Sequence, residues 1–327
     1  MDSYRLYGCS KKIFRRRRYF NSCFCSVWYG CSSYKTTTAE IFNQSINVTT
    51  AGAWASGGNL TAANTTRGAA GTQTAGLAFG GYVTGPVGLT ETYDGNAWTE
   101  VNNLSNAREG LAGAGTQTAA LAFGGYDSPD HVGETETYDG TSWTEVGDLN
   151  DTRRKLCGLG TQTAALAAGG DAPGNTANSE EWNGSSWTEG ENLNTARDNL
   201  GGLGIQTAGL AFGGDSDRSE EYNGTAWTEG NDMIESRQNL NGAGLQTAGL
   251  AFGGGTGSPN VVAHSEYYDG TNWSTSPNIG STRYNVTGAG TATAALMIGG
   301  QKGPVLATVE EFTGDTTVLN YKTITTS

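Results

Sequence analysis

The chain of 327 residues is poor in the residues that helical, disulfide-rich and membrane-spanning proteins need. It has 6 prolines, 2 histidines and 5 cysteines, and charged residues make up 16% of it, against about 25% in an average protein. No run of about 18 apolar residues occurs, so we expect no membrane-spanning helix. Because proline is scarce and glycine has no three-residue period, collagen is excluded.

Cysteine and positive charge are concentrated in the first 35 residues. Four of the five cysteines lie there, and since only Cys157 lies beyond, the rest of the chain does not depend on disulfides. Eight of the 19 Lys and Arg residues also lie there, with a single acid, Asp2. The remainder therefore has 11 basic and 31 acidic residues, a net charge of −20. Such a charge repels phosphate backbones, so we expect no nucleic-acid partner for it.

Glycine, in contrast, is about twice as frequent as in average proteins, and it marks a repeat. Six Gly-Gly pairs and six tryptophans follow each other in steps of 44, 45, 44, 40 and 46 residues. This period is that of propeller blades and differs from ankyrin or TPR units. The pairs begin at Gly80, Gly124, Gly169, Gly213, Gly253 and Gly299, and the tryptophans are Trp54, Trp98, Trp143, Trp187, Trp227 and Trp273.

Each copy predicts four short strands. In the second copy a Gly/Ala-rich run leads to the apolar run Ala119–Phe123, and the dipeptide Asp139-Gly140 then separates Tyr138 from Trp143. Asp-Gly and Asn-Gly between β-prone segments predict a tight hairpin. Small residues suit inner strands that converge on an axis, and Tyr and Trp suit outer strands where blades diverge. We therefore expect these aromatic residues to form core.

The two ends of the repeat complete one another. The last copy has a third-strand pattern at 310–312 with no tryptophan after it, whereas Trp54 lies in an outer-strand pattern with no inner strand before it. Pairing these two segments would close the ring and remove an open sheet edge. We predict an all-β, six-bladed propeller over residues 38–327. Its Thr-rich tail, Val318–Ser327, is expected to pair with Tyr34–Phe42.

A double glycine, then Tyr, then Trp about five residues later resembles the kelch repeat, over about residues 38–314. The amino-acid sequence of residues 115–125 and 192–197 is more narrowly similar to that of kelch-like virion proteins of marine tailed phages. The resemblance implies a structural protein of an extracellular phage particle, either a tail fibre or a capsid decoration. The first copy departs from the pattern, with Asn64 where the others have arginine before the first strand. These arginines are Arg108, Arg153, Arg197, Arg237 and Arg283.

All variation in repeat length lies between the second and third strands, because every tryptophan is followed by a double glycine after 26 residues. In an up-and-down blade these loops share one face with the connections between blades, and the tight turns share the other. Variable loops on a rigid scaffold are where recognition usually lies. The residues we expect to bind a sugar or receptor are Tyr82, Tyr126, Asp127, His131, Asp171, Asp215 and His264. A drift in loop length without function is the alternative.

Catalytic signals are weak. The two histidines lie in different copies, and a copper site of the galactose-oxidase type needs more imidazoles and a matched Tyr–Cys pair. Glu134 with Glu136, or Glu180 with Glu181, could in principle form a glycosidase pair. Glutamate recurs at this position in the other copies, which argues for a structural role. We expect no catalytic residue, no metal and no cofactor.

Residues 1–37 form a basic, Cys-rich segment that differs abruptly from the rest. It has Arg15, Arg16, Arg17 and Arg18, and the stretch around Trp28 and Tyr29 resembles a short hairpin near the start of phage fibre proteins. We interpret it as an assembly arm that binds other virion proteins. A nucleic acid, an anionic lipid surface or an acidic partner could also bind such a charge run. A mis-assigned start or a frameshift would give the same change in composition.

The sequence thus predicts a non-enzymatic virion structural protein, multimeric within the particle, whose loop face is available for host attachment or glycan binding. A cellular kelch-type module that binds protein or carbohydrate is the alternative hypothesis. A glycan-cleaving enzyme is a third.

Overall fold

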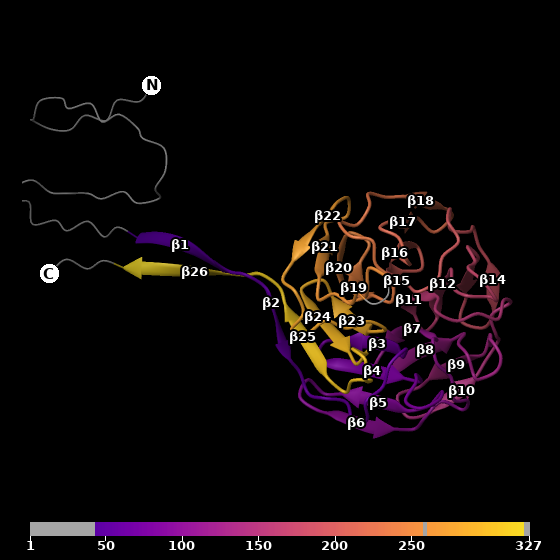
Figure 1. Ribbon diagram of the computed structural model, residues 1–327. Coiled ribbons are helices and arrows are strands. Elements are labelled where there is room, and N and C mark those ends of the chain that lie inside the picture. The colour runs from indigo at the N-terminus through magenta and orange to yellow at the C-terminus, as the bar shows by residue number, and fades with distance from the viewer. Residues whose placement is uncertain (1–42, 258–259, 324–327) are drawn as a thin grey trace, which may run out of the picture. The chain divides into compact units, whose positions relative to one another are not determined.

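The computed structural model describes residues 43–257 and 260–323, and all regular structure in them is β (Figure 1). No helix in these ranges is long and apolar enough to cross a membrane. The large compact unit, Ile46–Asn320, consists of six four-stranded antiparallel sheets around one axis, so the predicted six-bladed propeller is confirmed.

Five blades are formed by four consecutive strands each. Blades 1 to 3 consist of β3 (Gly68–Thr72), β4 (Ala75–Phe79), β5 (Thr90–Tyr93) and β6 (Trp98–Val101), then β7 (Ala112–Thr116), β8 (Ala119–Phe123), β9 (Thr135–Tyr138) and β10 (Trp143–Glu145), then β11 (Cys157–Thr161), β12 (Ala164–Ala168), β13 (Ser179–Trp182) and β14 (Trp187–Glu189). Blades 4 and 5 consist of β15 (Leu200–Ile205), β16 (Ala208–Gly213), β17 (Ser219–Tyr222) and β18 (Trp227–Glu229), then β19 (Asn241–Leu245), β20 (Ala248–Phe252), β21 (Ser265–Tyr268) and β22 (Trp273–Ser276).

The sixth blade joins the two ends of the repeat. It is formed by β23 (Thr287–Thr291), β24 (Ala294–Ile298), β25 (Val309–Thr313) and, from the other end of the chain, β2 (Ala53–Ser56). Trp54 pairs with Phe312 across this sheet, and its ring centroid lies 5.2 Å from that of Phe252 in blade 5. Trp54 therefore fills the position that the other tryptophans fill, and the predicted closure is confirmed.

The inner strands are built from Gly and Ala because neighbouring blades approach too closely for larger side chains. A Cβ on Gly113 of β7 would lie 2.6 Å from the backbone oxygen of Ala69 in blade 1. No carbon approaches an oxygen so closely without displacing it. The prediction of small residues at the axis is thus confirmed.

Aromatic side chains fill the gaps between the outer parts of the blades. The buried Trp143 ring lies 4.9 Å, between centroids, from both Tyr138 of its own blade and Phe79 of blade 1. Its Nε1 donates a hydrogen bond of 3.1 Å to Thr90 Oγ1 of blade 1. Each such tryptophan joins its own blade to the preceding one, as the expectation of a structural role requires.

The C-terminal strand pairs with a different segment from the one predicted. β26 (Thr316–Thr323), which overlaps the predicted tail strand, pairs with β1 (Asn43–Thr50), whereas residues 34–42 lie outside the described ranges. The reason is register: because Ala53 pairs with Thr313, continuing the ladder outward brings residues 43–50 opposite 316–323. A Thr-rich composition favours a strand but does not select its partner.

We expect Trp143→Ala to destabilise the protein by about 3–5 kcal/mol, since it removes a large buried ring and leaves a cavity between blades 1 and 2. Urea unfolding followed by circular dichroism measures this. Thr144→Ala, at the exposed next position of β10, is the control and should change the free energy of unfolding by less than about 0.5 kcal/mol. A loss below about 1 kcal/mol at Trp143 would contradict its place in the core.

Candidate binding face

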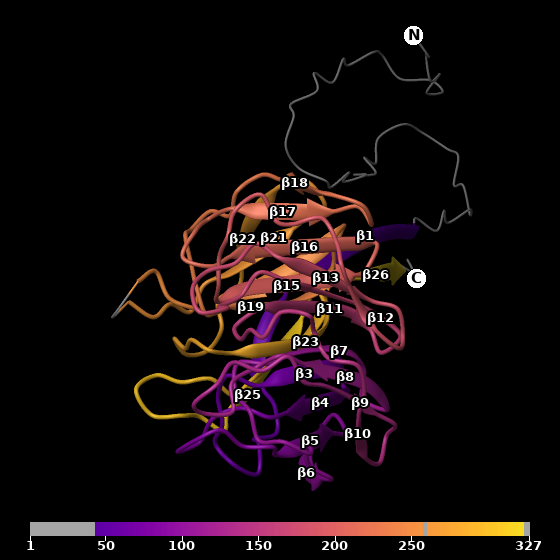
Figure 2. The same ribbon diagram turned by 90° about the vertical axis from the view of Figure 1, so that its right-hand side faces the viewer.

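The variable loops and the connections between blades lie on one face of the propeller, called here the loop face. In blade 2 the loop residue Tyr126 forms backbone bridges both to Glu109, in the preceding connection, and to His131, within the same loop. Figure 2 shows two of these loops, the orange one of blade 5 and the yellow one of blade 6, extending to the left. The predicted separation into one face with variable loops and one face with tight turns is confirmed.

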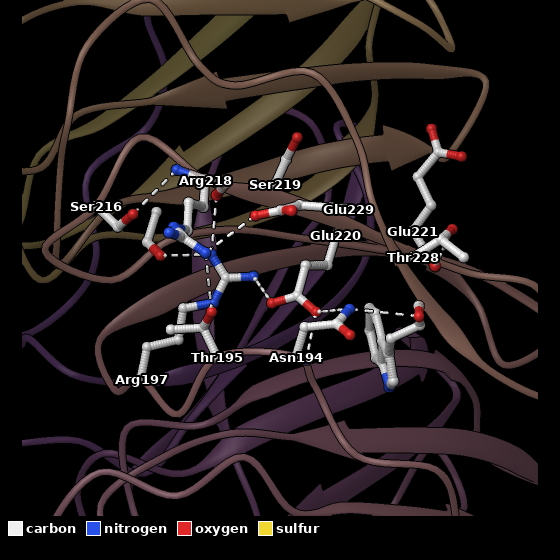
Figure 3. A network of polar contacts seen from close by, with 12 residues as sticks. Asn194, Thr195, Arg197, Ser216, Arg218, Ser219, Glu220, Glu221, Thr228 and Glu229 are labelled. Atoms are coloured by element: carbon white, nitrogen blue, oxygen red, sulfur yellow. Dashed lines mark hydrogen bonds and ion pairs between the residues drawn. The ribbon is translucent and has the colours of Figure 1, made fainter.

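A buried arginine holds the loop of each blade. In blade 4, Arg197 Nη1 donates to the carbonyl of Arg218 at 2.8 Å (Figure 3). It also donates to the carbonyl of Gly213 at 3.0 Å, so that it binds both ends of the loop of this blade. Its Nη2 donates to Glu220 Oε1 at 2.9 Å. Desolvation lowers the pKa of Arg197 below its ordinary value, and the charge of Glu220 acts in the opposite direction. The side chain therefore fixes the loop ends while its charge is neutralised within the core.

The glutamate extends this link to the connection before the blade. Glu220 Oε2 accepts hydrogen bonds from the backbone N–H and the side-chain amide of Asn194, at 2.6 and 2.8 Å (Figure 3). In every blade the arginine also binds the carbonyl of the last loop residue, and the glutamate binds a backbone N–H of the connection. The six pairs are Arg67–Glu91, Arg108–Glu136, Arg153–Glu180, Arg197–Glu220, Arg237–Glu266 and Arg283–Glu310.

The first blade obtains this pair in another way. Asn64 replaces the arginine, and its Nδ2 donates to the Gly80 carbonyl at 2.9 Å. Arg67, three residues later, supplies the charge and binds Glu91 Oε1 at 3.0 Å. The departure of the first copy from the repeat is thus compensated by a residue that the repeat pattern does not mark.

The glutamates considered for glycoside hydrolysis form ion pairs or hydrogen bonds with other side chains. Glu134 and Glu136 both form ion pairs with Arg108, each at 3.1 Å. Glu180 pairs with Arg153 at 3.1 Å, and Glu181 Oε1 accepts a hydrogen bond of 2.5 Å from Tyr222 Oη. These contacts give the recurrent glutamates a structural role.

Three of the predicted binding residues meet on the loop face. Asp171 Oδ2 accepts a hydrogen bond of 3.2 Å from Arg154 Nε and lies 3.2 Å from His131 Nε2. The Arg154 guanidinium lies 4.6 Å from the centroid of the Tyr126 ring, a cation–π contact. The Tyr126 and His131 rings pack edge to face at 5.6 Å. We call Tyr126, His131, Arg154 and Asp171 the charged cluster.

The charged cluster holds its carboxylate ionised. A hydrogen bond from the Gly174 backbone N–H, together with those from His131 and Arg154, lowers the pKa of Asp171 to about 2 against an ordinary 3.8. Sequence reasoning missed Arg154, although one signal was available. It follows the repeated Arg153 at a position where the other copies have Thr65, Glu109, Asp198, Gln238 and Tyr284.

The other predicted binding residues do not join this cluster. Tyr82 and Asp127 are exposed on the loops of blades 1 and 2. Asp215, also exposed, accepts a hydrogen bond of 3.4 Å from Gln238 Nε2. His264 Nδ1 lies 2.5 Å from Glu235 Oε2 in blade 5. The predicted residues Arg15, Arg16, Arg17, Arg18, Trp28 and Tyr29 lie outside the described ranges.

A closed ring of backbone hydrogen bonds surrounds the axis at the centre of the loop face. One residue of each connection has a positive φ, between 52° and 63°, and its N–H donates to the carbonyl of the same position in the preceding blade, at 2.7 to 3.4 Å. The bond from Thr66 to Asn285 joins the first blade to the sixth. The members are Thr66, Gly110, Lys155, Asn199, Asn239 and Asn285.

Within residues 43–257 and 260–323, no three His, Cys, Asp or Glu side chains are close enough to hold a metal ion. Cys157 is buried, and desolvation raises the pKa of its thiol to about 11, so that it is protonated at neutral pH.

In comparisons with known proteins, no family model matches the chain, and no curated protein is similar to it.

We expect Glu220→Gln to lower the free energy of unfolding by about 3–5 kcal/mol, because it leaves the Arg197 charge buried without a partner. Glu229→Gln is the matched control: Glu229 lies opposite Glu220 on the neighbouring strand but is exposed and pairs with Arg218 on the surface. It should cost less than about 1 kcal/mol. Equal effects of the two changes in chemical denaturation would show that the buried pair is not structural.

The low pKa of Asp171 predicts a pH-dependent stability. Because the carboxylate loses protons more easily in the folded state, it stabilises that state above pH 4, and the contribution is lost as the pH falls from about 4 to about 2. We expect the Tm of the wild type to exceed that of Asp171→Asn at neutral pH, and this difference to shrink below pH 4. Asp127→Asn, at an exposed position, should show no such convergence. A pH-independent difference for Asp171→Asn would contradict the assignment.

Proposed function

We propose that this protein is a non-enzymatic, kelch-like structural protein of a tailed-phage particle, which presents its loop face to the host surface. The observation that carries the proposal is the contrast between the two faces. Turns on the uniform face hardly vary, whereas the loops on the other face differ in length and sequence above one repeated set of ion pairs. Recognition usually lies on such loops.

The chemistry of the loop face favours binding over catalysis. The recurrent glutamates are held in ion pairs, and the charged cluster satisfies its own charges through Arg154. The resemblance of residues 115–125 and 192–197 to phage virion proteins supports a place on the particle. Residues 1–37, with their excess of positive charge, would bind other virion proteins there.

Quantitative mass spectrometry of purified particles from the source tests the location. We expect peptides of this chain at a fixed copy number per particle, including peptides from residues 1–35. Hundreds of copies would indicate a capsid decoration or tail-tube protein, and a handful would indicate a fibre. Absence of the chain from particles overturns the virion proposal and leaves the cellular kelch-type binding module in its place.

Two changes to the chain test its parts on the particle. Deletion of residues 1–35 should abolish incorporation, and unchanged incorporation would contradict an assembly role.

Replacing residues 127–131 by Gly and Ser keeps Glu134 and its contact with Arg108, so the blade should remain folded. Adsorption to host cells should fall while Tm changes little. Ile205→Thr, in the tight-turn position of blade 4 on the opposite face, is the control.

A further inference from the structure

The loop face contains a hollow between the loops of two neighbouring blades. It has a volume of about 330 Å³ and lies between the loops of blades 5 and 6, the orange and yellow loops of Figure 2. The described residues that line it include Gln238, Asn239, Asn260, Val261 and Tyr284. We propose that this hollow binds a neutral saccharide, an inference that rests on the proposed role of the loop face in host recognition.

Backbone hydrogen bonds hold several of the residues that line the hollow. Gln238 and Gly255 exchange two such bonds, of 3.0 and 2.9 Å, and Tyr284 and Gln301 exchange two more, of 3.1 and 2.9 Å. Asn239 belongs to the hydrogen-bonded ring around the axis and donates to Asn199 at 2.9 Å. The backbones of Gln238, Asn239 and Tyr284 are therefore held in place before a ligand binds, which lowers the entropic cost of binding.

The lining has no charge, although the protein has a net charge of −13. None of the described residues that line the hollow is acidic or basic, and the nearby carboxylate of Asp215 accepts a hydrogen bond of 3.4 Å from the lining residue Gln238. An anion, a cation or a metal ion would be bound there without a compensating charge, which is unfavourable in a partly enclosed site. A neutral polar ligand is the class that this lining accommodates.

The polar groups of the lining residues can form hydrogen bonds with adjacent hydroxyls of a sugar. Each amide offers two N–H donors and one oxygen acceptor, and a sugar hydroxyl both donates and accepts. Gln238 and Asn239 make only long contacts with other side chains, of 3.4 Å each, so their amides can turn to a ligand at little cost. The ring of Tyr284 supplies a flat apolar surface for the C–H face of a pyranose. A volume of a few hundred Å³ is that of an ordinary small-molecule site.

The charged cluster of blades 2 and 3 provides the contrast within the same face. There the loop residues bind each other, with Asp171 between Arg154 and His131. In blades 5 and 6 the corresponding positions of the connections hold Gln238 and Tyr284, which form no ion pair. On the same framework, the loop side chains of blades 2 and 3 bind one another, whereas those of blades 5 and 6 leave an uncharged, partly apolar hollow.

The test uses the full chain and immobilised saccharides. The panel holds neutral hexoses, N-acetylhexosamines and their short oligomers, with uronic and sialic acids as the charged counterparts. We expect binding to members of the neutral set, and at least about tenfold weaker binding by Tyr284→Ala, which removes the stacking surface. Tyr284→Phe keeps the ring and should retain most of the affinity. Binding to acidic sugars alone, or to none of the panel, overturns the proposal.

A matched pair of variants separates the hollow from the rest of the surface. Asn260→Asp replaces an exposed amide in the hollow by a carboxylate, and Asn96→Asp makes the same change at an exposed hairpin turn on the opposite face. Only the first should weaken binding. Val261→Trp fills the hollow without removing a polar group, so it should also abolish binding. If Val261→Trp keeps its Tm and still binds as well as the wild type, the hollow is not the site.

Host-cell adsorption distinguishes this proposal from the proposed function. If particles that carry the chain adsorb through the loop face, but the isolated chain binds no neutral saccharide, the hollow proposal fails and the virion role stands. If the chain binds neutral saccharides through Tyr284 but is absent from particles, the virion role fails and the cellular binding module is favoured.

Discussion

The buried arginine–glutamate pair is the interaction on which the loop face depends. It binds the last carbonyl of a loop on one side and a backbone N–H of the preceding connection on the other, as Arg197 and Glu220 do in blade 4. A buried ion pair carries a large desolvation cost, so its own contribution to stability is small. Its main effect is to hold the loop ends in place. Because both loop ends are held by residues outside the loop, the sequence between Gly214 and Arg218 is free to change in length and chemistry.

Closure of the ring is the second constraint, and three independent contacts provide it. Strand β2 pairs with β25, the Gln73 amide donates to the carbonyls of Ala295 and Phe312, and the Thr66 N–H donates to Asn285. Each lies at a different radius, from the outer strand to the axis. A blade cannot bury both of its faces alone, so these contacts turn six marginal units into one cooperative structure.

The repeat was sufficient to predict the number of blades, the closing role of Trp54 and the face on which the variable loops lie. These features follow from spacing, and spacing is what a sequence displays. Arg67 and Arg154 could not be assigned in this way. Neither arginine recurs at its position in the other copies. Arg67 pairs with Glu91, 24 residues later, and Arg154 with Asp171, 17 residues later, and only the folded chain brings each pair together. The open hollow beside Tyr284 is equally invisible to the pattern, since it is defined by space between two loops.

Loop variation has two physical outcomes on this scaffold. Around Asp171 the added polar groups neutralise one another, so the loops gain order and offer little free hydrogen-bonding capacity. Around Tyr284 the lining groups are uncharged and weakly engaged, so their capacity remains for a ligand. Both outcomes rest on the same six ion pairs. Variability of a loop is therefore a weaker guide to recognition than the balance between the polar groups that it presents and those that it satisfies itself.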